Sequence, residues 1–202
     1  MGLALAMAVL SQKTLADPPA VNLGSASGFA VLAGSGITVV GATTISGNLG
    51  TFPTPAITGL ENVTLNGVNH AGDAVTQAAK TDLGLAYGDA AGRTPTVTLP
   101  LAADLGGQTL VPGVYSESSS IFLTGDLQLD AQGDPDAVWV FQAGSTLITA
   151  TDSKVELLNG ALASHVFWQV GSSATLGANT AFAGGILAFT TITLQTGASV
   201  DG

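Results

Sequence analysis

The sequence predicts a mainly β protein in which short strands wind into a solenoid and one long α-helix packs along one face. Three observations lead to this fold class: a composition rich in glycine and apolar residues but poor in charge, a set of internal repeats, and a single segment with helical periodicity. The 202 residues suffice for one domain with a sizeable core.

Composition and charge limit the classes of function. Apolar residues make up 46% of the chain and charged residues only 9%, which is the opposite of a disordered protein. The net charge is −10 and the chain has only 4 Lys and Arg residues. We therefore exclude nucleic acids and membrane surfaces as partners, because both bind proteins through cations. The chain has no cysteine, which excludes disulfides, cysteine-ligated metals and thiol nucleophiles.

The N-terminal residues are typical of a leader. Residues 2–10, GLALAMAVL, form an apolar run that is too short to span a bilayer but suits the core of a signal peptide. Small residues precede Asp17, and no basic region stands before the run, as in an incomplete leader. An apolar N-terminal strand or helix is the alternative. We expect residues 1–16 to be the signal peptide of a secreted protein and residues 17–202 to form one domain.

One helix interrupts the predicted strands. Strands are expected at residues 29–33 and 37–40, before a turn that contains two prolines. Residues 70–91 then change to helical periodicity, with Asn69 as the expected N-cap and Gly92 at the end. The apolar stripe of this helix consists of Val75, Ala79, Leu83, Ala86, Tyr87 and Ala90. Because the stripe is rich in alanine, we expect the helix to lie close against another surface.

Internal repeats predict the solenoid. Residues 139–157 align without gaps on residues 166–184, which lie 27 positions later, and residues 31–47 align on 186–202 at 192 − 37 = 155 positions. The repeats are 18 to 27 residues long with strand character, which is typical of a β-solenoid in which each repeat forms one coil. The alignments place apolar residues in one column: Ile37, Ile121, Leu147, Ala174 and Ile192. A β-sandwich is the alternative, but matched columns favour the solenoid because they stack into one core.

Two kinds of outer surface are expected on this solenoid. The segments FAVLA, AVWVFQA, HVFWQV and GILAF are apolar on both strand faces, so both faces must be covered, and the helix is the available cover. The strands that follow them alternate instead, with threonine and serine outward around an inward aliphatic residue. We expect that second face to have no cover.

The outward hydroxyl residues point to the function. They are Thr38, Ser120, Thr146, Ser173, Thr175, Thr191 and Thr193, with Phe122 and Ile148 among them. Threonine favours strands in general, so a merely soluble surface is the alternative, but the usual lysines and glutamates are nearly absent. Coils stacked ~4.8 Å apart, with alternate residues ~6.7 Å apart, present a regular grid of methyls and hydroxyls. Such a grid suits an ordered lattice, and ice is the abundant case.

Catalytic and metal sites are not expected. The DAQGDPD segment, residues 130–136, clusters carboxylates but lacks the spacing of a calcium loop, and we interpret it as a solvated turn. His70 and His165 have no third ligand near them in the sequence. No Gly-x-Ser-x-Gly motif occurs, and the glutamates fall at different points of the repeat. We therefore expect no enzyme activity, no cofactor and no metal.

Several segments together carry a family resemblance: NLGSASGFAVLAGSGI, TTISGNLGT, AYGDAAGR, LGGQTLVPGVY, WVFQAGSTL and GGILAFTTITLQTGASVDG. Through them, residues 21–202 resemble the microbial ice-binding (antifreeze) protein family. The resemblance implies an irregular, discontinuous right-handed β-helix with one flanking α-helix, in which the first coil stands beside the last. It also implies that Ser35 and the pair Thr190–Thr191 lie on the flat face. Family members normally continue past the equivalent of Gly202, so we expect this chain to be truncated at its C-terminal coil.

The sequence therefore predicts a secreted, monomeric, non-catalytic protein that adsorbs to ice crystals through one flat face. The expected results are thermal hysteresis and inhibition of ice recrystallisation. The predicted contact residues are Ser35, Thr38, Ser120, Thr146, Ser173, Thr175, Thr190, Thr191 and Thr193. An extracellular adhesin or a carbohydrate-binding solenoid module is the alternative.

Overall fold

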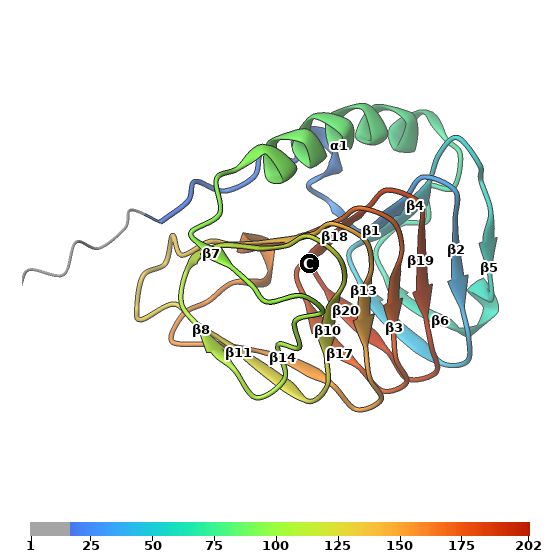
Figure 1. Cartoon of the computed structure of the whole chain (residues 1–202). Coiled ribbons are helices and arrows are strands. Elements are labelled where there is room, and N and C mark those ends of the chain that lie inside the picture. The colour runs from blue at the N-terminus through green and yellow to red at the C-terminus, as the bar shows by residue number, and fades with distance from the viewer. Residues whose placement is uncertain (1–16) are drawn as a thin grey trace, which may run out of the picture.

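Three parallel β-sheets and one long α-helix form the fold, which confirms the predicted fold class (Figure 1). The computed structural model describes residues 17–202, so the expected leader lies outside the described residues. Sheet A consists, in spatial order, of β4 (Asn48–Thr51), β1 (Phe29–Ala33), β18 (Gly185–Ala188), β15 (Val166–Val170), β12 (Trp139–Ala143), β9 (Gly113–Glu117) and β7 (Val97–Thr98). Sheet B consists of β10 (Ile121–Leu123), β13 (Leu147–Thr149), β16 (Ala174–Leu176), β19 (Thr191–Leu194), β2 (Gly36–Val39) and β5 (Ile57–Thr58). Sheet C consists of β6 (Val63–Asn66), β3 (Thr43–Ser46), β20 (Ser199–Asp201), β17 (Ala181–Ala183), β14 (Lys154–Leu158), β11 (Asp126–Asp130) and β8 (Thr109–Leu110).

Each complete coil of the solenoid contributes one strand to each sheet, in the order A, B, C. For example, β12, β13 and β14 form one coil, and β15, β16 and β17 form the next. The pairing in sheet B confirms the predicted column, because Ile121 lies opposite Leu147, Leu147 opposite Ala174, and Ala174 opposite Ile192. The repeat read from the sequence is therefore the coil of the fold.

The first and last coils are neighbours, which explains their similar sequences. Strand β2 pairs with β19 so that Ile37 lies opposite Ile192, and β1 meets β18 at Val31 and Ile186. After the coil of β4, β5 and β6 the chain leaves the solenoid for the helix, and it returns at the opposite end of the stack with β7. The discontinuous path implied by the family resemblance is therefore present.

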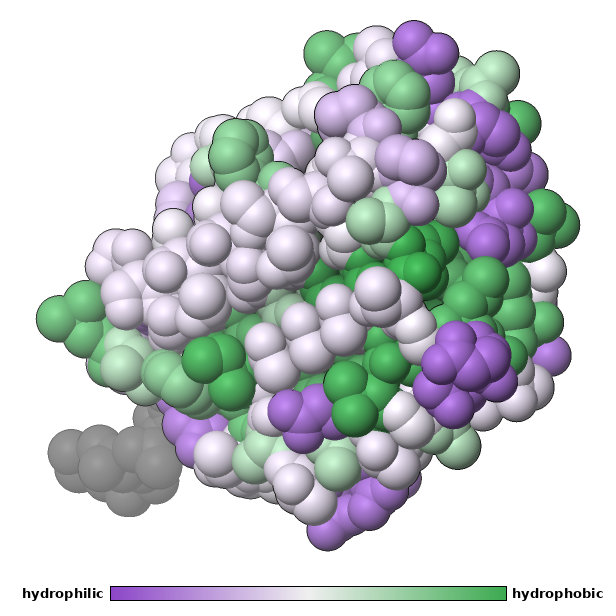
Figure 2. All heavy atoms as spheres, turned by 90° about the vertical axis from the view of Figure 1, so that its right-hand side faces the viewer, coloured by the Kyte–Doolittle hydropathy of each residue, from purple (hydrophilic) through white to green (hydrophobic). Residues whose placement is uncertain are grey.

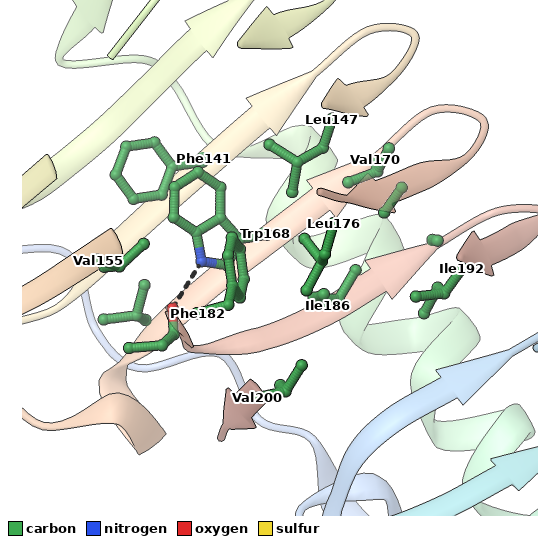
Figure 3. Packing of buried hydrophobic residues seen from close by; sticks show 14 of the residues in the cluster. Phe141, Leu147, Val155, Trp168, Val170, Leu176, Phe182, Ile186, Ile192 and Val200 are labelled. Carbon is green, nitrogen blue, oxygen red and sulfur yellow. Dashed lines mark hydrogen bonds between the residues drawn. The ribbon is translucent and has the colours of Figure 1, made fainter. Parts of the chain in front are cut away.

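The core is a stack of inward side chains from successive coils (Figure 3). Phe141 of β12 lies directly over Trp168 of β15, with ring centroids 3.9 Å apart and planes within 11° of parallel. The indole Nε1–H of Trp168 donates to the carbonyl oxygen of Ala183 at 3.0 Å, so its one polar group is paired inside the core. Fully burying an apolar side chain of this kind contributes about 1.5–3 kcal/mol, and the strand register stacks one on the next.

Helix α1 (Ala74–Gly92) covers the outer side of sheet A (Figure 1). Gln142, on β12, fixes the end of the helix, because its side-chain amide donates to the carbonyl oxygens of Ala90 at 2.6 Å and Arg93 at 2.9 Å. The prediction that the helix covers the strands that are apolar on both faces is confirmed. The buried apolar cluster between helix and sheet comprises Val21, Ala26, Phe29, Leu32, Ala79, Leu83, Ala86, Ala90, Val114, Val138, Val140, Phe167 and Leu187.

The predicted start of the helix is wrong by one turn. The N-cap is Asp73, whose carboxylate accepts the N–H of Thr76 at 2.8 Å. Asn69 instead uses its side-chain oxygen to accept the N–H of Ala71 in the preceding turn. Both residue types cap helices well, and they stand only four positions apart in the chain. The sequence pattern therefore identified the region of the cap but not the residue.

The predicted buried stripe is wrong at Val75. This side chain is 48% exposed, and Thr76 is buried on the face that carries Ala79. The hydroxyl of Thr76 donates to the carbonyl oxygen of His70, which satisfies its polar group inside the contact. Within residues 17–202, no helix is both long and apolar enough to cross a membrane.

One end of the solenoid leaves core side chains partly exposed. At the right of Figure 1, β5 and β6 belong to the last coil of the stack, and Ile57, Val63 and Leu65 pack against the core while remaining only partly buried. Figure 2 views this end and shows apolar surface between rows of weakly polar residues. The coil that contributes β5 is therefore the edge of sheet B.

Candidate functional site

The outer face of sheet B carries two columns of side chains. The burial of its strands alternates, so that every second residue points away from the core. In what we name the first column, residues that stand directly before or at the start of each strand line up as Ser120, Thr146, Ser173, Thr191 and Gly36. In the second column, the mid-strand residues line up as Phe122, Ile148, Thr175, Thr193, Thr38 and Thr58. Neither column contains a charged residue.

Hydroxyls of the first column bond to one another. The hydroxyls of Ser120 and Thr146 lie 2.7 Å apart, within hydrogen-bond distance. Ser173 is a junction: its hydroxyl receives a hydrogen bond from Thr191 at 2.9 Å and lies 2.7 Å from the hydroxyl of Thr190. These bonds restrict rotation of the serine side chains and of the threonines, which are already stiff at χ1, so the bonded part of the first column is held in a fixed geometry.

The second column leaves its hydroxyls largely free. Thr58 donates to Thr38 at 3.3 Å, and the hydroxyls of Thr175 and Thr193 bond to no other residue in the range 17–202. Both residues are half-buried on the outer side of the strands, so their hydroxyls remain available to bond water. The central part of the face, formed by β16 and β19, combines this free column with the bonded one.

All nine residues predicted from the sequence lie on or beside this face. Seven of them belong to the two columns. Thr190 and Ser35 lie at the corner between sheets A and B, where the N–H of Ser35 donates to the carbonyl oxygen of Thr190 at 3.1 Å. The structure thus brings the predicted residues together.

Sequence reasoning missed Thr58, which extends the second column by one coil. Strand β5 contains only two residues and follows a proline-rich turn, so the repeat is hard to see there. The signal that could have found it is Ile57, which lies opposite Ile37 and so continues the apolar core column.

The outer faces of the other two sheets differ from that of sheet B. Helix α1 covers sheet A. Sheet C is open but charged: Asp126 lies opposite Lys154, and the Lys154 ammonium donates to Glu156 at 2.7 Å. This bond raises the pKa of Lys154 and lowers that of Glu156. Among the described residues, sheet B therefore presents the outer face that is both uncovered and free of charge.

The comparisons with known proteins agree with this geometry. A protein family described as ice-binding-like matches residues 31–202, which is most of the chain. The chain belongs to the ice-binding protein family.

Individual relatives and solved structures of this ice-binding family are similar to the chain over most of its length. An ice-binding protein of Nostoc sp. (strain HG1) is 49% identical over 179 residues, which cover 89% of this chain but 66% of that protein. An ice-binding protein of Colwellia sp. is 38% identical, with 93% and 79% covered. The crystal structure of an ice-binding protein from an Antarctic biological consortium is 40% identical, covers 96% of both chains and has a TM-score of 0.81.

Residues 17–202 of this ice-binding-family chain also form hollows away from sheet B. The best-defined one, about 370 Å³, lies beside His165 and Phe167 and is lined by the segment from Ala20 to Phe29 and by Gly202. Nδ1 of His165 is buried without a hydrogen-bond partner. The lining also contains Ser27 and Ser164 but no aspartate or glutamate. No group of three His, Asp or Glu side chains in residues 17–202 is placed to hold a metal ion.

Proposed function

We propose that the protein adsorbs to ice crystals through the outer face of sheet B, producing thermal hysteresis and inhibiting ice recrystallisation. Residues 17–202 act as one domain, a secreted monomer without catalytic activity. The observation that carries the proposal is the second column, in which threonines of adjacent coils stand in strict register on an uncovered, uncharged surface.

The geometry of the face explains why ice is the proposed partner. Parallel strands repeat every ~4.8 Å across the coils and alternate residues every ~6.7 Å along a strand. The threonine methyls order water around apolar groups, while the hydroxyls anchor that water by hydrogen bonds. Backbone ladders and stiff β-branched side chains hold the pattern before binding, so little entropy is lost on adsorption. An extended, rigid pattern selects an extended, rigid partner.

The two columns take different parts in this proposal. Thr38, Thr175 and Thr193 offer free methyls and hydroxyls and make the contact with ice, joined by Thr58. The first column supports them: Ser173 and Thr191 stand beside Thr175 and Thr193 and keep the face flat, and Ser120 and Thr146 continue the row beside Phe122 and Ile148. Thr190 and Ser35 complete the edge at the corner with sheet A.

The alternative function, a carbohydrate-binding module, is not favoured by the position of the aromatic residues. Sugar-binding surfaces stack sugar rings on exposed aromatic side chains. Trp139, Phe141, Phe167 and Trp168, which contribute most of the aromatic area of the repeats, are all buried. The strands β16, β19, β2 and β5 carry no aromatic or charged side chain, and the exposed Phe189 lies beside Tyr87 at the corner with sheet A.

The experiment that tests the proposal combines ice-affinity partitioning with one obstructed variant. Thr193→Tyr places a bulky ring in the middle of the second column, where a solid surface must sit flush, so we expect enrichment in growing ice and thermal hysteresis to be nearly lost. Thr193 points outward, so the melting temperature should stay within the range of ordinary surface substitutions.

Lys154→Tyr is the matched control, since Lys154 is exposed on sheet C and the new ring is the same. It should leave ice adsorption unchanged. Activity that survives Thr193→Tyr but is lost in Lys154→Tyr would mean that sheet C, not sheet B, binds ice. Absence of the wild-type protein from the ice fraction would refute ice binding itself.

A further inference from the structure

Only the central coils carry a hydroxyl in both columns of sheet B. In the coil of β16 these are Ser173 and Thr175, and in the coil of β19 they are Thr191 and Thr193, which lies opposite Thr175. The two coils are adjacent in the sheet order β13, β16, β19, β2. They form a two-by-two block of hydroxyl residues.

On each side of this block, one residue breaks the pattern. In the coil of β13, Thr146 occupies the first column but Ile148 occupies the second, opposite Thr175. In the coil of β2, Thr38 occupies the second column but Gly36 occupies the first, opposite Thr191. The two interruptions therefore stand at opposite corners of the block, one too large and one too small.

Each interruption has a physical consequence for a flat partner. Ile148 points outward with 37% of its surface exposed, and its extra carbon reaches beyond the level of a threonine and offers no hydroxyl. Gly36 has no side chain, so the row beside Thr38 is empty. An ice surface that fits the block therefore meets the protruding Ile148 in the coil of β13 and the empty position at Gly36 in the coil of β2.

We propose that Ile148 and Gly36 are the residues that limit the ice contact of this face, because they confine the array with a hydroxyl in both columns to the coils of β16 and β19 and leave only the second column, Thr38 and Thr58, beyond it. The inference rests on the proposed function and adds to it the positions that set how far the contact extends. Replacing either residue by threonine extends the array by one coil.

The surroundings of both positions accommodate threonine. Residue 148 already carries a β-branched side chain between Phe122 and Thr175, and threonine is smaller. A Cβ added at Gly36 would lie 3.3 Å from the carbonyl oxygen of Ala56 and 3.7 Å from its Cβ. Ala56 is exposed and precedes the short strand β5, and its carbonyl oxygen accepts the N–H of Ile37 at 3.0 Å, so this oxygen must shift by a few tenths of an ångström while keeping that bond.

The test is a gain of activity. Thermal hysteresis is measured at equal molar concentration for Ile148→Thr, Gly36→Thr and the double variant, after folding has been checked by circular dichroism. If adsorption scales with contact area, each single variant raises hysteresis by about half, as the complete pairs increase from two to three, and the double variant raises it further. Ile148→Val, which lowers the bump without adding a hydroxyl, should give a smaller rise and serves if Ile148→Thr folds poorly.

Two matched controls separate the array from general effects. Leu162→Thr makes a similar exchange on an exposed loop away from sheet B and should leave hysteresis unchanged. Gly36→Ala stiffens the backbone without supplying a methyl and hydroxyl pair. An equal rise in Gly36→Ala and Gly36→Thr would overturn the inference at that position.

Failure of the inference is distinguishable from failure of the proposed function. Folded Ile148→Thr and Gly36→Thr proteins with wild-type hysteresis, in an assay where Thr193→Tyr is inactive, refute the limiting role and leave sheet B as the ice face. Retention of activity by Thr193→Tyr refutes both.

Discussion

The outer surfaces of sheets A and B are built from the same coils, yet they serve opposite purposes. Along sheet A the outward residues are large and apolar, as with Val140 and Phe167, and the helix buries them. Along sheet B the outward residues are threonines such as Thr175 and Thr193, and nothing in the described chain covers them. The inward residues of both sheets belong to one core.

Because both faces are formed by the same coils, the solenoid itself does not decide which face is functional. Parallel pairing fixes register for every outward position alike, whatever the side chain. The identity of alternate residues then decides whether a face needs a cover or can meet a partner. Substitutions on the covered face should therefore change stability, and substitutions on the open face should change ice adsorption without changing stability.

The largest effect is expected where the helix meets sheet A. Ala79 is fully buried in this contact, so Ala79→Asp places a carboxylate without a partner in an apolar cluster. We expect a loss of several kcal/mol in the free energy of unfolding, measured by thermal or denaturant unfolding. If this variant does not accumulate as folded protein, Leu83→Ala gives a milder form of the same test, with a loss of about 2–5 kcal/mol.

Val75→Asp is the control on the same helix. The stripe predicted from the sequence would make this substitution as damaging as Ala79→Asp, whereas the structure leaves Val75 half exposed in the first turn. A carboxylate there lies near the positive end of the helix dipole, so the change in stability should be small. Equal losses in the two variants would mean that the helix packs through the predicted stripe instead.

A smaller loss of stability is expected at acid pH, and it should affect the covered face of sheet A but not ice adsorption by sheet B. Asp73 caps the helix, and Asp82 accepts hydrogen bonds from the hydroxyl of Ser25 at 2.6 Å and from its N–H at 2.7 Å. The hydrogen bond from the N–H of Thr76 lowers the pKa of Asp73, and those from Ser25 lower the pKa of Asp82. Both carboxylates hold the cover of sheet A, and the strands of sheet B contain no titratable side chain.

The direction of the pH effect follows from these lowered pKa values. The stabilisation is fully present above the ordinary carboxyl pKa of about 4 and is lost as the pH falls below it, through the pKa of the folded state. Melting temperature should therefore drop in acid, while ice adsorption of the protein that remains folded should not change. Asp82→Asn should lose less melting temperature on acidification than the wild type. An unchanged acid response in that variant would show that Asp82 contributes nothing to it.

Features that recur in several coils could be predicted from the sequence, and details that occur once could not. The core column and the neighbouring first and last coils were accessible, because Ile37 and Ile192 stand at matching positions in similar segments. The helix could be predicted as an element, but its buried face could not. Alanines occur on all sides of the helix, and the predicted apolar stripe included Val75 where the structure buries Thr76. Thr58 was hidden because its coil is interrupted by prolines.

Hydrogen bonding on the face was beyond any sequence pattern. The first column reads Ser120, Thr146, Ser173 and Thr191, and this order does not tell which hydroxyls bond to one another. The structure shows that Ser173 connects Thr190 and Thr191 while Thr175 stays free. The structure places the predicted residues on or beside one face, and the proposed division into supporting and contacting columns rests on these hydrogen bonds.

The smallest effect is expected from removing metal ions. Two of the three carboxylates of the 130–136 turn accept hydrogen bonds, since Asp130 accepts the N–H of Gln132 at 2.8 Å and the side-chain amide of Asn159 at 2.7 Å, and Asp134 accepts the N–H of Asp136 at 2.9 Å. The turn follows sheet C, and the columns of sheet B contain no anionic ligand that a cation could bridge.

Thermal hysteresis should therefore be the same with and without EDTA at matched osmolality. Moderate salt should change it only by the colligative effect, because an uncharged face has no ion pair to screen. Added calcium should also leave the melting temperature unchanged, since a cation bound by the folded state alone would raise it by mass action. If chelation removed hysteresis and calcium restored it, the expectations for EDTA and for calcium would both be wrong. It would show that a cation, rather than the threonine columns alone, determines the difference between the open face and the rest of the solenoid.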